Sequence, residues 1–210
     1  MHTRICIIRH GETDWNLARR IQGQIDIPLN SAGRAQALAM AFNAAHHRFS
    51  AIYSSDLRRA NETAQALAER EGQTVTTLTA LRERHYGIFQ NVTKDEAGQI
   101  HPQAHALYLA RDLDYDFESG ENLTNFAQRT MNVFDSLAKQ HRAQQIAVVC
   151  HAGLLDVMYR RATGRELQPA RDFVIPNCAL NWFRHDGQRW HLESWDDHHH
   201  LSHVLLDSVE

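Results

Sequence analysis

Short apolar runs alternate with amphipathic helical patterns along most of this chain, and that alternation most limits the folds open to it. Residues 5–8 and 146–150 are apolar at consecutive positions, which is typical of strands that are covered on both faces. Residues 51–53 and 75–78 carry weaker strand patterns. Because helical patterns separate these strands, the chain predicts an α/β fold. We expect a three-layer sandwich, with a mostly parallel central sheet and helices on both faces.

Three helices are predicted from capping residues and from apolar residues spaced three and four apart. Asn30 or Ser31 begins the first, whose expected buried face is Ala35, Leu38, Ala39 and Phe42. The second covers residues 57–71, since Gly72 can end a helix. The third covers about 121–141.

The segment 91–120 does not follow this alternation, because it is polar and rich in His, Asp and Tyr. We expect a short helical insertion that caps one edge of the sheet within a single domain, residues 1–210. In the tail, 179–195, the dipeptide Asp186-Gly187 predicts a hairpin between two strands.

The composition excludes several classes of protein. With 22 Lys+Arg against 25 Asp+Glu, the formal net charge is −3, so a strongly basic nucleic-acid binder is not expected. Nothing approaches the ~18 consecutive apolar residues of a membrane helix. Three cysteines without C-x-x-C spacing favour a reducing cytoplasm, and we expect Cys6 and Cys150 to be core residues. No feature of the composition indicates an oligomeric state.

Two strand ends carry a histidine followed closely by glycine. Arg9-His10-Gly11 follows the first strand, and His151-Ala152-Gly153 follows the strand at 146–150. In an open α/β sheet, ligands bind beyond the carboxyl ends of the strands. One histidine there is commonly an ordinary polar residue, but two at matching positions indicate a site. Gly11 would let the backbone approach a ligand closely.

Arg58 and Glu83 each leave two interpretations open. Arg58 lies in the first turn of the second predicted helix, where it is either solvated beside Glu62 or binds an anion with the helix N-terminus. Glu83 follows the weak strand at 75–78, and a glutamate between arginines is usually part of an ion pair. Beside a phosphate it could instead donate a proton to a leaving group.

Four motifs in order resemble the histidine phosphatase superfamily, which includes cofactor-dependent phosphoglycerate mutases and many phosphatases. They are Arg9-His10-Gly11-Glu12-Thr13-x-Trp15-Asn16, Tyr53-Ser54-Ser55-x-Leu57-x-Arg59-Ala60-x-Glu62-Thr63, Glu83-Arg84-His85-Tyr86-Gly87 and Val149-Cys150-His151-Ala152-Gly153. Asn177-Cys178-Ala179-Leu180-Asn181 resembles the family's closing strand. The resemblance covers nearly the whole chain.

The resemblance implies a metal-independent enzyme without a cofactor. His10 would attack phosphorus and become a phosphohistidine, while Arg9 and Arg58 would bind the phosphoryl oxygens. His151 would be protonated and His10 neutral, so their pKa values should be pushed apart. Glu83 would protonate the leaving oxygen and later take a proton from water.

The resemblance also suggests phosphate or substrate contacts for further residues, namely Gly11, Asn16, Gln22, Gly23, Arg84, Tyr86, Ala152 and Gly153. For Gln22 an ordinary loop role stays open, and Lys94 either lines the pocket mouth or is solvated. In the insertion, Arg111, Asp112, Asp114, Tyr115 and Asp116 could contact the rest of the substrate, and the acidic residues among them disfavour multiply phosphorylated substrates.

Transfer and hydrolysis both occur in this superfamily. Residues 83–87 resemble mutases, but Ile21-Gln22-Gly23-Gln24 stands where mutases carry a Phe-small-Gly-Trp segment. Residues 91–120 also lack the mutases' long insertion with its double arginine and proline run. We therefore expect a phosphatase acting on small-molecule phosphate esters. A cofactor-dependent phosphoglycerate mutase is the second hypothesis, and a non-catalytic phosphate-binding module is the third.

The other histidines are given no role in chemistry. His198-His199-His200 lacks a second group of metal ligands at suitable spacing and is interpreted as structural or solvated. Histidines 46, 47, 101, 105, 141 and 191 are expected at the surface.

Overall fold

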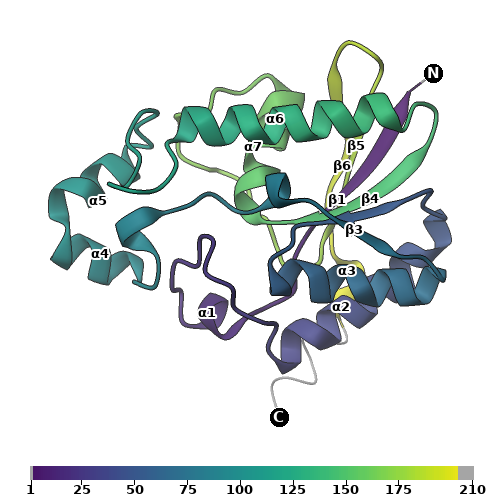
Figure 1. The fold of residues 1–210 in the computed structure, drawn as a ribbon, viewed down its shortest axis with the longest axis horizontal. Coiled ribbons are helices and arrows are strands. Elements are labelled where there is room, and N and C mark those ends of the chain that lie inside the picture. Colours follow the sequence, from purple (N-terminus) through teal and green to yellow (C-terminus); the bar gives the residue numbers. More distant parts are fainter. Residues whose placement is uncertain (1, 203–210) are drawn as a thin grey trace.

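A six-stranded sheet forms the middle layer of the protein (Figure 1). The computed structural model describes residues 2–202. The strands are β1 (Thr3–Arg9), β2 (Ile52–Ser54), β3 (Val75–Thr77), β4 (Gln145–Cys150), β5 (Leu180–His185) and β6 (Trp190–Asp197), in the order β3-β2-β4-β1-β5-β6. Neighbours among β1 to β4 run parallel, whereas β5 and β6 are antiparallel. The predicted mostly parallel sheet and the tail hairpin are confirmed.

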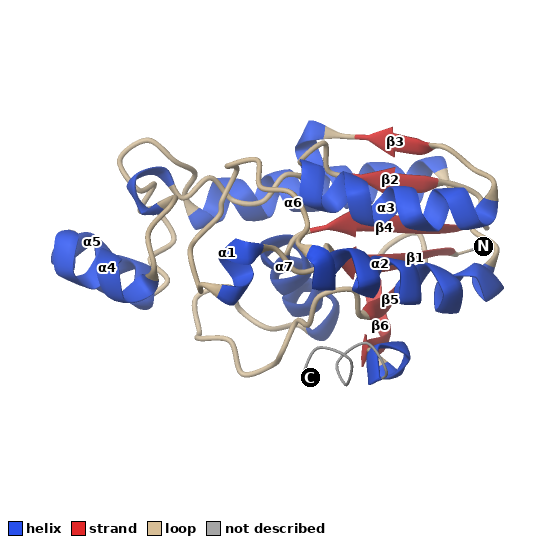
Figure 2. Ribbon diagram, turned by 90° about the horizontal axis from the view of Figure 1, so that it is seen from below, coloured by secondary structure: helices blue, strands red, loops and turns tan. Residues whose placement is uncertain are grey.

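Helices cover both faces of this sheet, as Figure 2 shows. On one face lie α2 (Ser31–Ala44) and α3 (Arg58–Glu71), and on the other lie α6 (Leu123–Gln140) and α7 (Ala152–Thr163). Successive residues of β1 point to opposite faces, so Cys6 and Ile8 pack against α2 and α3 while Ile5 and Ile7 pack against α6 and α7. This explains why residues 5–8 of the first strand are all apolar, and it confirms the three-layer sandwich.

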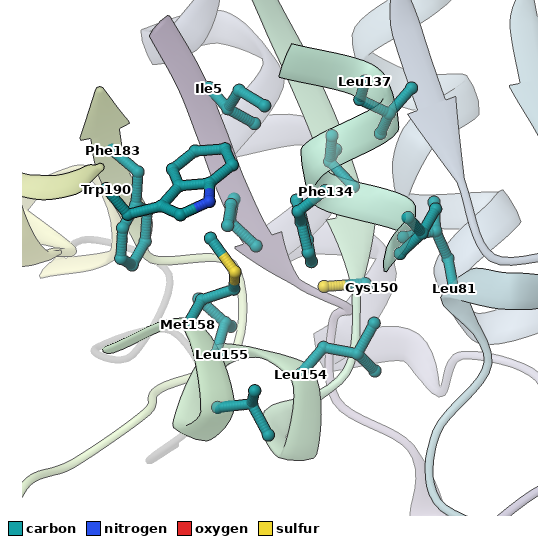
Figure 3. Close-up of a cluster of buried hydrophobic side chains, with 14 of the residues drawn as sticks. Ile5, Leu81, Phe134, Leu137, Cys150, Leu154, Leu155, Met158, Phe183 and Trp190 are labelled. Carbon is teal, nitrogen blue, oxygen red and sulfur yellow. The ribbon is translucent and has the colours of Figure 1, made fainter. Parts of the chain in front are cut away.

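The core on the side of α6 and α7 is built from large side chains. Figure 3 shows Phe134 and Leu137 of α6 with Cys150, Met158 and Trp190 around them. Phe134 is fully buried, and burying a side chain of this size stabilises the fold by about 1.5–3 kcal/mol. Cys6 and Cys150 are fully buried in the two cores, as predicted.

The predicted face of α2 is wrong. Leu38 and Phe42 are 64% and 61% exposed, whereas Met40, Ala41 and Ala44 are buried against α3 and the sheet. Alanines occur on several faces of this helix, so their spacing did not identify the buried one. Small residues at the buried positions let α2 lie close to the small residues of α3.

His141 is also not at the surface. Its exposed fraction is 9%, and its Nε2 lies 2.8 Å from the hydroxyl of Tyr53 while Nδ1 lies 2.6 Å from Gln144 Oε1. A buried histidine needs such partners for its ring nitrogens, and here it joins α6 to β2.

Residues between β3 and α6 extend beyond the carboxyl ends of the parallel strands (Figure 2). They form α4 (Lys94–Ile100) and α5 (Pro102–Leu109), which share a small core around Phe89, Ala97 and Phe117. The loop after β1 contains the short α1 (Asp14–Leu17). Within residues 2–202, no helix is long and apolar enough to span a membrane. Short 3-10 turns complete the fold at Ala45–His47, Thr79–Leu81, Gly87–Phe89 and His199–Leu201.

Candidate active site

Two neighbouring parallel strands bring His10 and His151 together. Arg9 of β1 is paired with Cys150 of β4, and each histidine is the first residue after its strand. Their ring centroids are 5.2 Å apart. His10 is 4% exposed and His151 is fully buried, so both rings lie below the molecular surface.

His10 is held in one tautomer. Its Nδ1 lies 2.7 Å from the carbonyl oxygen of Gly11, and a carbonyl only accepts, so Nδ1 carries the hydrogen. Nε2 is thereby left with its lone pair. Burial, followed by the charges of Arg59 and Arg9, lowers the pKa of His10 well below 6.5. The ring is therefore a neutral imidazole with a free nitrogen, which is the form of a nucleophile.

Arg9 and Arg59 provide the positive charge around His10. Arg59 is 1% exposed, and its terminal nitrogens donate to the carbonyls of Ile25 (2.9 Å) and Gly23 (2.7 Å). Arg9 donates to the carbonyl of Ile175 at 2.6 Å. Burial lowers the pKa of each guanidinium to about 10, so both remain charged at neutral pH.

The sequence prediction named Arg58, and the structure places Arg59 in the pocket instead. Arg58 lies on the outer side of α3, where its side chain is 59% exposed and lies 3.6 Å from Glu62. Neighbouring residues of a helix differ by about 100° around its axis, so one of the two arginines points inward and the other outward. The solvated interpretation of Arg58 matches its position.

His151 differs from the expectation of a protonated ring. Burial lowers its pKa well below 6.5, and the charges of Arg59, His10 and Arg9 add to the effect. The protein's own groups thus lower the pKa values of both histidines rather than separating them. Neither ring nitrogen of His151 has a hydrogen-bond partner among the described residues. Such buried, unpaired nitrogens indicate a ligand-binding position.

Glu83 is fixed beside the N-terminus of α7. Its two carboxylate oxygens accept from the backbone N–H groups of Arg84 (2.8 Å) and Gly153 (3.0 Å). A Cβ on residue 153 would lie 2.2 Å from Glu83 Oε1, so this approach requires glycine. The carboxyl group therefore has one fixed orientation at the edge of the pocket.

A cavity of about 160 Å³ lies among these side chains. Asn16, Gln22, Gly23, Tyr86 and Ala152, all named from the sequence, line it with Arg9, His10 and Glu83. Asn16 uses its Oδ1 to accept from Thr13 at the start of α1, which leaves its amide NH₂ as a donor. Sequence reasoning missed Arg20, Ile21, Arg59 and Tyr108, which also line the cavity.

Gly11 serves a different purpose from the one expected. It does not line the cavity, and a Cβ there would lie 2.4 Å from the carbonyl oxygen of Gly33. Its N–H donates to Thr63 Oγ1 at 3.0 Å. Gly11 therefore allows the loop after β1 to approach α2, which fixes the position of His10.

A larger chamber of about 470 Å³ adjoins the catalytic cavity, and Tyr86 and Tyr108 line both. Arg84, Lys94 and Gly153, which the sequence placed at the site, line the chamber. The walls of the chamber come from residues 84–86, the insertion, the first turns of α6 and α7, and the loop after α7.

Comparison with known proteins identifies the family. The sequence profile of the histidine phosphatase superfamily (branch 1) matches residues 5–198. The chain belongs to the histidine phosphatase superfamily. This histidine phosphatase is 37% identical to phosphoglycerate mutase-like protein 4 of Arabidopsis thaliana over 206 residues, covering 95% of this chain and 87% of the relative. It is 36% identical to the metal-independent phosphoserine phosphatase of the same plant over 205 residues, with coverages of 96% and 84%.

A solved structure agrees in fold. The phosphoserine phosphatase of Entamoeba histolytica superposes on this histidine phosphatase with a TM-score of 0.85 at 27% identity, covering 95% of this chain and 99% of that chain.

Away from the pocket, Asp197, His199 and His200 have possible ligand atoms within 4.8 Å of one another. Protein groups already engage them, however. His199 pairs with Asp197 at 2.5 Å, and His200 Nε2 donates to the carbonyl of Cys178 at 3.0 Å. The group therefore supports the structural interpretation of this histidine run.

Proposed function

We propose that this histidine phosphatase hydrolyses small-molecule phosphomonoesters through a phosphohistidine on His10. The observation that carries the proposal is the state of His10: a buried neutral imidazole whose free Nε2 lies among the cationic groups Arg9 and Arg59. A phosphate monoester carries nearly two negative charges that repel a nucleophile. A site that neutralises those charges while keeping its nucleophile unprotonated suits this reaction.

In the first step the lone pair of His10 Nε2 forms a bond to phosphorus, and the bond from phosphorus to the ester oxygen breaks. The leaving oxygen takes a proton from Glu83, whose two backbone hydrogen bonds aim the carboxyl group. The guanidinium groups of Arg9 and Arg59 bind the phosphoryl oxygens with a planar arrangement of donors that matches them.

In the second step a water oxygen attacks phosphorus and the bond to Nε2 breaks, which releases inorganic phosphate. The water gives its proton to Glu83, so the carboxyl group returns to its starting state. We assign His151 to a phosphoryl oxygen, because both its ring nitrogens are buried without a partner among the described residues. A bound dianion would favour a protonated ring, opposite to the effect of the neighbouring arginines.

Hydrolysis is favoured over transfer to a second hydroxyl by the loop that lines the pocket. Ile21-Gln22-Gly23-Gln24 replaces the segment that mutases resembling this chain carry, and Gln22 and Gly23 line the cavity itself. Relatives named as phosphatases support the same choice. Other relatives are named phosphoglycerate mutase-like or probable phosphoglycerate mutase, so phosphoglycerate mutase activity is the second candidate.

We also propose that residues 1–210 form one domain in which residues 91–120 act as a cap over the chamber. The salt bridge of Arg20 with Glu96, 3.2 Å long, supports this, because it joins the loop after β1 to α4. A cytoplasmic location remains our proposal, supported by three cysteines that are buried free thiols.

The test is hydrolysis of p-nitrophenyl phosphate by the wild type and by His10→Ala, with samples quenched in alkali, where the P–N bond of a phosphohistidine survives, searched for phosphate bound to His10. We expect turnover and a trapped phosphohistidine in the wild type, and neither in the variant. Absence of turnover from acid to neutral pH, with no trapped phosphate, would falsify the phosphatase proposal. Phosphoglycerate interconversion that needs 2,3-bisphosphoglycerate would favour the mutase instead.

A further inference from the structure

The chamber beside the catalytic cavity has an excess of positive charge. Arg84, Lys94, Arg111 and Arg171 line it, against two acidic residues, Asp112 and Asp156. The two aspartates offset two of these four positive charges, which leaves the lining with a net charge of +2. Asp112 accepts hydrogen bonds from the backbone N–H groups of residues 114 and 115, and Asp116 accepts one from that of residue 118. These carboxylates therefore stabilise turns within the insertion.

Asp156 organises three of the arginines in this region. It is 3% exposed, and its carboxylate accepts from Arg111 at 2.7 Å, from Arg160 at 3.1 Å and from Arg171 at 3.3 Å. One negative charge is thus shared by three positive charges, so the cluster has a net charge of +2. An uncompensated buried charge is costly, which makes this cluster receptive to an anion.

Arg111 is positioned by its own contacts. Its φ is +50°, in the left-handed region that a non-glycine residue adopts only at a cost. Its Nε donates to the carbonyl of Leu167 at 2.9 Å, and its Nη2 pairs with Asp156. The insertion is therefore fastened to the loop after α7 through this side chain.

Arg171 is the arginine of this cluster whose two terminal nitrogens remain free to bind a ligand. It is attached to Asp156 through Nε alone, and no described residue accepts from its two terminal nitrogens. Its side chain is 35% exposed and lines the chamber. Burial lowers the pKa of Arg9 and the charge of Arg171 adds to that effect, so Arg171 lies within electrostatic reach of the phosphoryl site. A guanidinium with both terminal nitrogens free matches a carboxylate, which accepts two parallel hydrogen bonds.

We propose that the chamber binds the leaving group of a phosphomonoester that carries a carboxylate, and that Arg171 is the residue that selects it. The proposal rests on the phosphatase function above. Tyr115 adds a second polar group near such a leaving group, because the residue lines the chamber and its buried hydroxyl has no partner among the described residues. The ester oxygen would lie near Glu83, and the carboxylate would extend past Tyr86 and Tyr108 toward Arg171.

The experiment compares pairs of substrates that differ in the carboxylate. O-phospho-L-serine is set against O-phosphoethanolamine, and 3-phosphoglycerate against glycerol 3-phosphate. In the wild type we expect kcat/KM to be higher for the carboxylated member of each pair by about tenfold or more, the effect of a charge-assisted hydrogen bond. Arg171→Gln should bring this ratio close to one, and Arg171→Lys should restore part of it, because lysine keeps the charge without the planar pair of donors.

Arg161→Gln is the matched control, since Arg161 is exposed on α7 and does not line the chamber. It should keep the wild-type ratio. Equal kcat/KM values within each pair in the wild type would overturn the proposal, as would a ratio that survives Arg171→Gln.

Binding to His10→Ala, measured by calorimetry, separates this proposal from the phosphatase function. If the wild type hydrolyses none of the esters but the variant binds the carboxylated ones more tightly, then the function fails and the binding site stands. If the wild type hydrolyses both members of each pair equally and the variant binds them equally, then the function stands and the site is refuted.

Discussion

Replacing Arg59 with methionine tests the arrangement of charge around His10 most directly. Burial lowers the pKa of Arg59 from an ordinary 12.5 to about 10. In the protein without bound phosphate, the charged form of Arg59 is therefore destabilised by about 3 kcal/mol. A phosphoryl dianion would reverse this destabilisation when it binds. Without that charge, the developing negative charge in the transition state loses a donor, and such a loss typically reduces kcat/KM by about 10²–10³.

The effect of Arg59→Met on stability should be smaller than its effect on activity. The carbonyls of Gly23 and Ile25 lose their donor, which costs about 1–3 kcal/mol each. Removing a buried charge returns about 3 kcal/mol, the destabilisation derived from the lowered pKa. These effects offset each other, so we expect the free energy of unfolding to change by no more than about 3 kcal/mol.

The assay measures p-nitrophenyl phosphate hydrolysis and its inhibition by inorganic phosphate, with thermal unfolding as the check on folding. Arg58→Met is the matched control on the next residue. Its side chain is 59% exposed, and its pair with Glu62 contributes only about 0.3–0.5 kcal/mol, so its kcat/KM should stay within about twofold of wild type. A folded Arg59→Met protein with wild-type activity, or a larger loss in Arg58→Met, would refute the reasoning.

Three further predictions address the carboxylate, the histidines and the arginine cluster. Gly153→Ala puts a Cβ 2.2 Å from Glu83 Oε1, so the carboxylate must move and kcat should fall by about 10²-fold with an unchanged circular dichroism spectrum. His10 and His151 have folded-state pKa values below 6.5, so the unfolded chain binds more protons as the pH falls below 6.5. Their contribution to stability is present above pH 6.5 and is lost as the pH falls through the lowered pKa values. Denaturant titrations across that range should show a fall in the free energy of unfolding, and the fall should be smaller in a double His→Gln variant. Asp156→Asn leaves three arginines without their shared carboxylate and should lower the free energy of unfolding by about 3 kcal/mol, and an unchanged denaturation midpoint would count against that role.

The positions of His10 and His151 could be predicted because they depend only on strand order and direction. Both follow apolar strands, and parallel neighbours end at the same edge of a sheet. Arg59 was predictable in principle as well. Arg59, Thr63 and Leu67 are spaced by four residues and are all buried on one face of α3, so the helical period separates Arg59 from Arg58.

Other features depended on tertiary packing. In α2 the exposed Leu38 and Phe42 follow the same spacing as a buried face, and the Phe42 ring is covered by Arg70, 4.9 Å from its centroid. The chamber could not be predicted because Arg111 and Arg171 lie 60 residues apart, and neither belongs to a motif. The shared carboxylate of Asp156 brings the two side chains together in the folded protein.

The arginines of the site have two effects on His10 that act in the same direction for catalysis. Burial lowers the pKa of His10 and their positive charge lowers it further, which keeps Nε2 unprotonated even where an ordinary histidine would be half protonated. The same charge attracts the phosphoryl dianion that Nε2 must attack. Burial destabilises the charged forms of Arg9 and Arg59, which lowers the pKa of each to about 10. A phosphodiester carries one negative charge fewer than a monoester and would stabilise the two guanidinium groups less, so the site should discriminate against phosphodiesters. A pairwise comparison of p-nitrophenyl phosphate with its bis ester measures that discrimination, and comparable kcat/KM values for the two would show that charge neutralisation does not govern this pocket.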